Sequence, residues 1–241
     1  MKYKLNQELK SSYDKESFKF EKDLSLNHEE IEKSKNIFDI DLNNNIAVPK
    51  KLEVIALLAG LPFPKSFQNH IGSIQNQIKS ILRDKLYYMV KKENLGLELL
   101  VLKWPEQDRN LILEKNIIRF LDLLNISEIE IIFDGIQIHT DGCIVLRGFD
   151  VNESFLRLRK IILDKFNTIP KKQSNWVHIP IGRILTNLSL ADCKSLQNLI
   201  YKTREIDNYF PSQNINKIKL IHENQWYMEK KSTIKYWKLK K

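Results

Sequence analysis

The order of apolar patterns along this chain repeats once, and that repeat constrains the fold more than any other feature. A helical period, a strand-like run and a second helical period begin near residues 66, 96 and 110, and again near 152, 178 and 189. The offset stays near 80 residues, as a duplicated lobe would give, although the halves share negligible identity. We therefore predict an α+β fold of two similar lobes, each a small, mostly antiparallel sheet with helices packed outside, and a cleft between the lobes.

Short signals locate the elements of both halves. Ser66 is a candidate helix N-cap, because Phe67, Ile71 and later apolar residues recur at three- and four-residue steps. Ser189 followed by Asp192 predicts the start of another helix. The expected helices are 66–82, 110–124, 155–166 and 189–201, and the expected strands are 95–102, 128–133, 176–185, 217–222, 225–230 and 233–239.

A β-hairpin is expected between the two halves. Ile136–His139 and Cys143–Phe149 are strand-like, and they flank Asp141-Gly142, a dipeptide typical of two-residue hairpin turns.

The first 45 residues differ in composition from the rest of the chain. They are rich in Lys, Glu and Asn and only weakly periodic, although Asn27 with Glu30 predicts one short helix. We expect residues 1–45 to be a polar, partly disordered extension. Residues 46–241 then form the two-lobed domain, with lobes at roughly 50–135 and 150–230 and the C-terminal strands added to them.

The formal net charge of +9 is unevenly distributed. The N-terminal extension is slightly acidic, whereas the last thirteen residues carry six lysines and one glutamate. Tyr236 and Trp237 lie among these lysines, a pattern compatible with phosphate contacts and base stacking. The same pattern fits a lysine-protected edge strand, and the charge pattern by itself favours that second interpretation.

Composition excludes several other classes of protein. The 42% hydrophobic content excludes a wholly disordered chain. The sequence contains no run of eighteen apolar residues, so we predict no membrane span. The N-terminus has no apolar stretch of a cleaved signal, so we expect a cytoplasmic protein. Cys143 and Cys193 alone cannot make a disulfide framework or a cysteine zinc site, and no metal-ligand spacing appears.

The two central strands occupy equivalent positions in the predicted lobes. Successive strand residues face opposite sides, so His178 and Pro180 share one face of their strand, and Gly96 and Glu98 can share one face of theirs. A site between the two sheets would be lined by these four residues.

In these segments the chain resembles the two-histidine (2H) phosphoesterase superfamily, which includes 2′-5′ RNA ligase-like proteins and cyclic phosphodiesterases. The resemblance spans about residues 50–240 and lies in KLYYMVKKENLGLELLVL, WVHIPIGRI and the hairpin GIQIHTDGCIVLRGF.

The resemblance implies a fold with two His-x-Thr/Ser motifs facing each other, with no metal or other cofactor. In that family one histidine acts as general base and the other as general acid, while the hydroxyl side chains hold the phosphate. Matched position by position, this chain keeps only His178. Gly96 and Glu98 replace the first histidine and its hydroxyl residue, and Pro180 replaces the second hydroxyl residue. The resemblance therefore implies a degenerate member.

Other residues are candidate substitutes for the lost groups. Glu98 acting opposite His178 is one alternative, and His139 in the sequence IHTD is another, although a hairpin-end histidine is favoured there. Trp176 shares the face of His178 and could stack a base or close the core. Alternation turns Arg183 away from His178, so an ion pair with a helix carboxylate is an alternative to phosphate binding by this residue. His28, His70 and His222 have no partner at a metal-ligand spacing.

Three functions remain open from the sequence. The first is a cleft that binds RNA ends or nucleotides without efficient turnover. The second is an active phosphodiesterase or RNA ligase-like enzyme that uses His178 with a rearranged partner. The third is a protein-interaction scaffold, which would recruit a partner through the N-terminal extension or the basic C-terminal tail. We favour the first, because three of the four motif positions have lost their chemistry.

Overall fold

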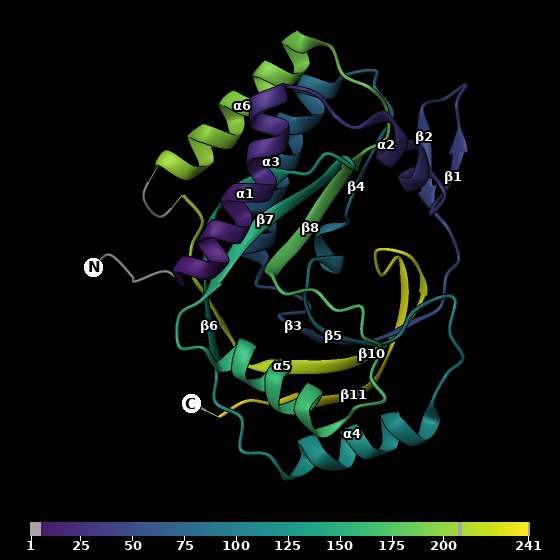
Figure 1. The fold of residues 1–241 in the computed structure, drawn as a ribbon, viewed down its shortest axis with the longest axis vertical. Coiled ribbons are helices and arrows are strands. Elements are labelled where there is room, and N and C mark those ends of the chain that lie inside the picture. The colour runs from purple at the N-terminus through teal and green to yellow at the C-terminus, as the bar shows by residue number, and fades with distance from the viewer. Residues whose placement is uncertain (1–5, 207–208, 241) are drawn as a thin grey trace.

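The computed structural model describes residues 6–206 and 209–240, which form two lobes, each built on an antiparallel sheet (Figure 1). The helices are α1 (Gln7–Asp23), α2 (His28–Lys35), α3 (Lys65–Leu82), α4 (Leu111–Leu123), α5 (Ser154–Lys165) and α6 (Leu190–Glu205), with a 3₁₀ turn at Lys92–Asn94. The strands are β1 (Phe38–Asp41), β2 (Ile46–Pro49), β3 (Val54–Ala59), β4 (Tyr87–Met89), β5 (Leu97–Lys103), β6 (Ile129–Ile138), β7 (Cys143–Asp150), β8 (Val177–Ile184), β9 (Gln213–Ile215), β10 (Lys217–Gln225) and β11 (Lys230–Lys238).

The two sheets confirm the predicted α+β architecture. The lower sheet in Figure 1 has the strand order β11-β10-β3-β5, and the upper sheet has the order β4-β8-β7-β6-β9. Helix α4 packs against the lower sheet, and α3 and α6 pack against the upper one. Helix α5 contacts both, through β5 of the lower sheet and β6 and β7 of the upper. Strands β1 and β2 form a separate hairpin at one side of the molecule.

The chain is divided between the lobes differently from our expectation of 50–135 and 150–230. Strands β10 and β11, from the end of the chain, complete the sheet that β3 and β5 begin. Helix α3, from the first half, packs against β8 and α6 of the other lobe, and α5 from the second half packs against β5. The order of elements repeats as predicted, but each half of the chain contributes strands or helices to both lobes. The spacing of apolar residues predicts the elements and does not predict which sheet each one joins.

Local capping explains where several helices begin. The Asn110 side chain accepts a hydrogen bond from the Leu113 amide at 2.9 Å, and Ser189 and Asp192 form the predicted capping box of α6. Asn27 likewise caps α2 through the Glu30 amide. Ser66 is not a cap, because α3 begins one residue earlier, after Pro64. No helix in the described part of the chain is long and apolar enough to cross a lipid bilayer.

The predicted hairpin forms, with a longer loop than expected. Residues 139–142 connect β6 to β7, and the Gly142 amide donates to the His139 carbonyl at 3.0 Å. Gly142 has a φ of +83°, the left-handed conformation that glycine adopts without strain. The expected strand 128–133 and the expected hairpin strand 136–139 form one irregular strand, β6.

The N-terminal segment is part of the folded core, contrary to the expectation of a partly disordered extension; residues 1–5 lie outside the described residues. Tyr13 and Phe20 of α1 are fully buried. The Tyr13 hydroxyl donates to the Val177 carbonyl at 2.7 Å and accepts from the Val177 amide at 3.1 Å, next to the motif strand β8. Leu9, Tyr13 and Phe20 recur at helical spacing, a signal that the polar composition around them obscured.

A β-bulge interrupts the motif strand β8. Ile144 pairs with Gly182 and Val145 with Pro180, so Ile181 is the extra residue. The buried Gln75 amide, from α3, donates to the Ile181 carbonyl at 2.9 Å and to the Val90 carbonyl at 2.7 Å. The bulge reverses the alternation of side chains beyond Ile181, which decides where Arg183 points.

Replacing Gln75 with leucine should destabilise the protein, because the carbonyls of Val90 and of the bulge residue Ile181 each lose a buried hydrogen-bond donor. We expect a loss of about 1–3 kcal/mol in the free energy of unfolding, measured by urea denaturation. Gln77→Leu on the same helix is the matched control and should change it by about 0.5 kcal/mol or less. Equal losses in the two variants would show that Gln75 does not support the bulge.

Candidate functional site

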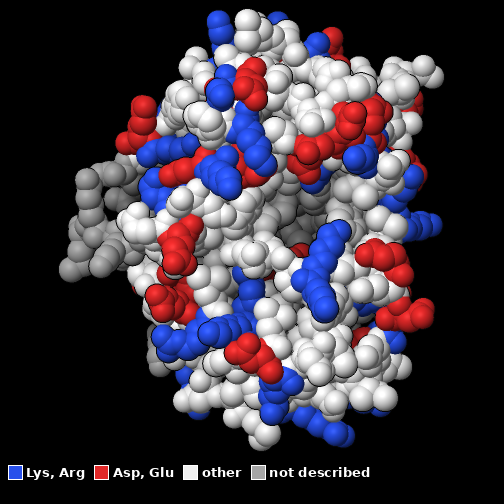
Figure 2. Space-filling model, in the orientation of Figure 1, with Lys and Arg blue, Asp and Glu red and all other residues white. Residues whose placement is uncertain are grey.

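A cavity of 220 Å³ lies between the two sheets, at the place where the motif strands face each other. Strands β3, β5 and β10 of one sheet form one wall, and β7 and β8 of the other form the opposite wall. Figure 2 shows the molecular face hollowed between the lobes. The lining residues are Val54, Ala56, Leu58, Gly96, Glu98, Trp104, Cys143, His178, Pro180, Arg183, Glu223, Trp226, Tyr227 and Met228.

The structure brings all four motif positions to this one cavity. Gly96 and Glu98 line it from the β5 side, and His178 and Pro180 line it from β8. A Cβ atom on Gly96 would lie 3.5 Å from the nearest Leu61 atoms, which is ordinary van der Waals contact. The glycine position therefore has room for a Cβ atom.

His178 lies in a site that disfavours the charged imidazolium. Burial, together with the nearby His139 and Arg159, lowers the pKa of His178 to about 3. Its Nδ1 atom is buried and makes no hydrogen bond with any residue that the structure describes. At neutral pH the ring is therefore a neutral, weakly basic imidazole.

Two carboxyl groups make the opposite wall acidic. Burial raises the pKa of Glu98, although Arg159 partly opposes that shift. Burial also raises the pKa of Glu223 to about 7, and the charge of Glu98 adds to this effect. The Glu223 carboxylate accepts the Met228 amide at 2.9 Å. The cavity therefore contains two carboxyl groups whose protonated form is favoured by burial.

Arg183 lines the cavity, contrary to the strict alternation that turned it away. The bulge at Ile181 adds one residue, so Arg183 emerges on the same side as His178 and Pro180. Its guanidinium is already engaged. It donates to the Asp141 carboxylate at 2.9 Å, to the Ser34 hydroxyl at 2.6 Å and to the Tyr227 hydroxyl at 2.9 Å. Its structural ion pair is with a hairpin-loop carboxylate rather than with a helix carboxylate.

The segment 225–230, expected to be a strand, is mostly a turn that supplies three side chains to the cavity. Tyr227 and Met228 both have positive φ, 59° and 58°, in a tight turn between β10 and β11. Trp226, Tyr227 and Met228 all line the cavity. Sequence analysis missed them, because positive φ at two bulky residues carries no glycine or asparagine signal. Glu223 and Trp104 were also missed, since nothing local marks either one.

Trp176 packs at one end of the site without lining the cavity. Its ring centroid lies 5.8 Å from that of His178, 5.1 Å from that of His139 and 5.1 Å from that of Tyr13. Its indole nitrogen donates to the Ser12 hydroxyl of α1 at 2.8 Å. The indole is thus held between the two imidazoles and α1. His139, favoured above as a hairpin-end histidine, therefore lies close to His178.

The two aromatic residues of the basic tail do not line the cavity, whereas Lys231 of the same tail pairs with Glu223 in the sheet and donates to the Met228 carbonyl at 3.1 Å. Trp237 is buried, and its indole nitrogen donates to the Asp122 carboxylate of α4 at 2.8 Å, whereas Tyr236 is exposed. Both belong to β11, the edge strand of its sheet, which matches the lysine-protected edge strand; Lys241 lies outside the described residues. Figure 2 shows acidic and basic side chains interspersed on the face that carries the hollow, so the described part of this face has no continuous basic patch.

The remaining histidines have local roles. His222 contacts the Glu53 carboxylate at 2.8 Å, the His28 ring contacts the Asn187 amide at 3.2 Å, and His70 packs edge-on against Phe210. Among residues 6–206 and 209–240, no three histidine, cysteine or acidic side chains come together as a metal site would require.

Known proteins are similar to this chain in structure but not detectably in sequence. No known protein-family model matches the sequence, and no curated protein is similar to it. E. coli LigT in its apo form superposes with a TM-score of 0.51 at 12% identity, covering 80% of this chain and 100% of LigT.

Two further solved structures give similar superpositions. TT0787 of Thermus thermophilus gives a TM-score of 0.54 at 12% identity, covering 77% of this chain and 97% of its own. ATU0111 from Agrobacterium tumefaciens, a protein described as of unknown function, gives a TM-score of 0.60 at 9% identity, covering 81% of this chain and 88% of its own. Identities this low show the fold alone. The chain therefore has the two-lobed fold of the two-histidine phosphoesterases, as its resemblance to them in sequence predicts.

Proposed function

We propose that this protein is a 2H phosphoesterase-like binding protein that has lost most of its catalytic motif and binds RNA ends or nucleotides without efficient turnover. One observation carries the proposal. The four motif positions line a single cavity, and only His178 among them has an imidazole. The cleft is thus present while most of the proton-transfer and phosphate-holding groups are absent from these four positions.

The chemistry of the site supports slow or absent turnover. Gly96 and Pro180 can neither donate nor accept a side-chain proton. His178 is a weak base because its pKa is lowered to about 3. A general acid or base typically contributes about 10²–10⁴-fold to the rate, so loss of the first histidine alone removes a large part of the family reaction.

The choice of ligand rests on the fold and on the cavity. E. coli LigT has been crystallised with ATP, with 3′-AMP and with NADP+. Those ligands belong to that protein, and they make nucleotides the first class to test with this one. The aromatic side chains of Trp104, Trp226 and Tyr227 in the cavity are suited to contact a base.

A second candidate, an active phosphodiesterase, is favoured by the buried carboxyl groups. Glu98 and Glu223 line the same cavity as His178, and both have raised pKa values. A carboxylic acid with a pKa of about 7 has the protonation state of a general acid at neutral pH. Turnover that depends on His178 together with Glu98 or Glu223 would establish this candidate in place of the first.

Short single-stranded RNA should bind with micromolar affinity at low salt, and the affinity should fall as salt rises, because phosphate contacts release counterions. Fluorescence polarisation at two salt concentrations measures this. The same preparation should not detectably hydrolyse 2′,3′-cyclic nucleotides or 2′-5′ dinucleotides. Absence of binding at low salt would reject the binding role, and turnover abolished by His178→Ala would reject the loss of catalysis.

Restoring the motif should restore activity. The triple variant Gly96→His, Glu98→Thr, Pro180→Thr rebuilds both His-x-Thr motifs, and Gly96 has room for the new Cβ. We expect hydrolysis of a 2′,3′-cyclic nucleotide to rise about 10²-fold or more over the unmodified protein. The same triple variant carrying His178→Ala is the control and should stay inactive. A folded triple variant without activity would show that these positions do not define the lost chemistry.

His178 should stay neutral over the physiological pH range. With its pKa lowered to about 3 by burial, the ring resonances should not titrate between about pH 8 and about pH 5. Two-dimensional NMR of the imidazole nitrogens measures this, with His178→Gln to assign the signals. A midpoint near the ordinary histidine value of about 6.5 would contradict it, since the ring would then be well hydrated.

A further inference from the structure

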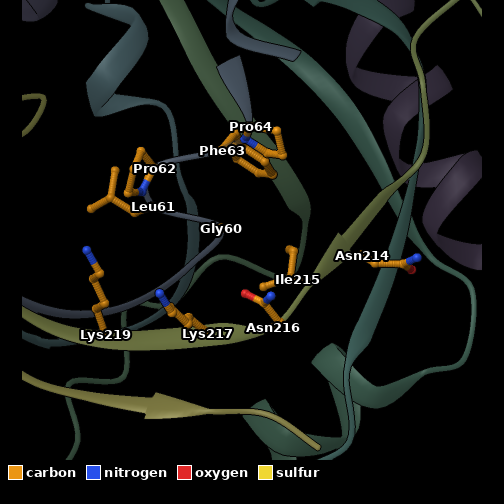
Figure 3. A pocket seen from close by; sticks show the side chains of 10 residues that line it. All are labelled: Gly60, Leu61, Pro62, Phe63, Pro64, Asn214, Ile215, Asn216, Lys217 and Lys219. Carbon is orange, nitrogen blue, oxygen red and sulfur yellow. The ribbon is translucent and has the colours of Figure 1, made fainter. Parts of the chain in front are cut away.

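A second pocket, of 300 Å³, shares none of the lining residues of the cavity. It lies between the segment Gly60–Pro64 and strand β10, with Asn214 and Asn216 at its edge. Figure 3 shows the side chains of Lys217 and Lys219 extending from β10 towards Leu61. Neither lysine forms an ion pair with any residue that the structure describes. This lysine pocket therefore offers two ammonium groups to an anion.

Strand register places the lysine pocket beside the acidic wall of the cavity. Lys219 pairs with Leu58 of β3, and Leu58 pairs with Glu98 of β5, so the three residues form one row across the sheet. Adjacent strands lie about 4.8 Å apart, which puts the backbones at the two ends of this row about 10 Å apart. Directly paired residues share a face, so Lys219 and Glu98 project on the same side of the sheet.

The two ends of this row have opposite chemistry. The cavity contains Glu98 and Glu223, while the cation among its lining residues, Arg183, is held by Asp141. A phosphate in the cavity would meet carboxyl groups, whereas a phosphate in the lysine pocket would meet Lys217 and Lys219. At 220 Å³ the cavity is also smaller than the roughly 300–1,000 Å³ of sites that enclose a whole drug-sized ligand. It fits one part of a nucleotide.

The chemistry of the cavity suits a planar ligand group that carries several hydrogen-bond donors. Trp104 and Trp226, with ring centroids 6.4 Å apart, and the floor of Val54, Ala56 and Leu58 provide apolar surface. The Glu223 carboxyl, with a pKa of about 7, is ionised at and above neutral pH and then provides two acceptor oxygens. Among the nucleobases, guanine presents two adjacent N–H donor groups on one edge, which a carboxylate accepts together. The Nδ1 of His178, which has no partner among the described residues, adds one more polar atom that a ligand can satisfy.

We propose that the cleft binds a guanine nucleotide or a guanosine-bearing RNA end, with the base in the acidic cavity and its phosphate on Lys217 and Lys219. The phosphate is then displaced from the place between the motif strands where the family performs its chemistry. This inference rests on the proposed function and assigns its ligand class and orientation.

The test separates base recognition from phosphate recognition. Isothermal titration calorimetry is carried out on the full chain with GMP, AMP, guanosine and ribose 5-phosphate. GMP should bind tightest, guanosine should bind about tenfold more weakly, and AMP should bind about tenfold more weakly than GMP, because each loses a charge-assisted contact. Ribose 5-phosphate should bind weakest.

Variants then assign the two ends of the ligand. Lys217→Gln with Lys219→Gln should lower the affinity for GMP to that for guanosine and leave guanosine binding unchanged. Glu223→Ala should weaken GMP and guanosine equally, by about tenfold. Lys194→Gln with Lys202→Gln removes the same charge from the exposed face of α6 and should change neither affinity. Thermal unfolding checks that each variant is folded.

The remaining outcomes of these titrations would each overturn one part of the proposal. Equal binding of AMP and GMP, or unchanged guanosine binding in Glu223→Ala, would overturn the placement of the base while leaving nucleotide binding intact. Unchanged GMP binding in the double lysine variant would overturn the placement of the phosphate. Absence of binding by every nucleotide and by single-stranded RNA would overturn the proposed function itself.

Discussion

One buried guanidinium joins the two motif strands, and the geometry of the site depends on it. Arg159 of α5 donates to the carbonyls of Leu99 and Glu98, both at 2.8 Å, and to that of Trp176 at 3.1 Å. It thereby links the backbone of β5 to the residue that precedes β8. Burial of this guanidinium lowers its pKa to about 10, so the group remains charged at neutral pH. Three carbonyls accept hydrogen bonds from the Nε and Nη2 of this buried cation, whereas its Nη1 has no partner among the described residues. These bonds connect the β5 wall of the cavity to the start of β8.

Helix α1 completes the same region from the other side. Arg147 of β7 is almost wholly buried and pairs with Asp14 of α1 at 3.0 Å and with Asp134 of β6 at 3.0 Å. Its neighbour in the sheet is His178, so the helix stabilises the surroundings of the one remaining motif histidine. The N-terminal segment therefore belongs to the architecture of the site, and its polar composition reflects ion pairs across an interface rather than disorder.

Sequence alone predicted the helices from α2 on and most strands after residue 95 in their order, because those depend on periods of apolar residues and on caps such as Asn27 and Ser189. It did not predict α1, β3 or β4. It also assigned Gly96, Glu98, His178 and Pro180 to facing strands, through their resemblance to known motifs. It could not place Arg183, whose direction depends on one extra residue at Ile181. It could not find Glu223 or Tyr227 either, since strand pairing between distant segments and an unmarked turn bring them to the cavity.

The exchange of elements between the lobes has a consequence for the order in which the chain can fold. Strand β3 pairs with β10, more than 150 residues later, so the lower sheet has both of its inner strands only after β10 has been made. Helix α3 likewise awaits β8 and α6. During synthesis the lower sheet stays incomplete, with β3 paired to β5 alone, until β10 and β11 have been made. A truncation near residue 215 would therefore remove β10 and β11, an inner strand and an edge strand of the lower sheet, rather than trim the upper sheet.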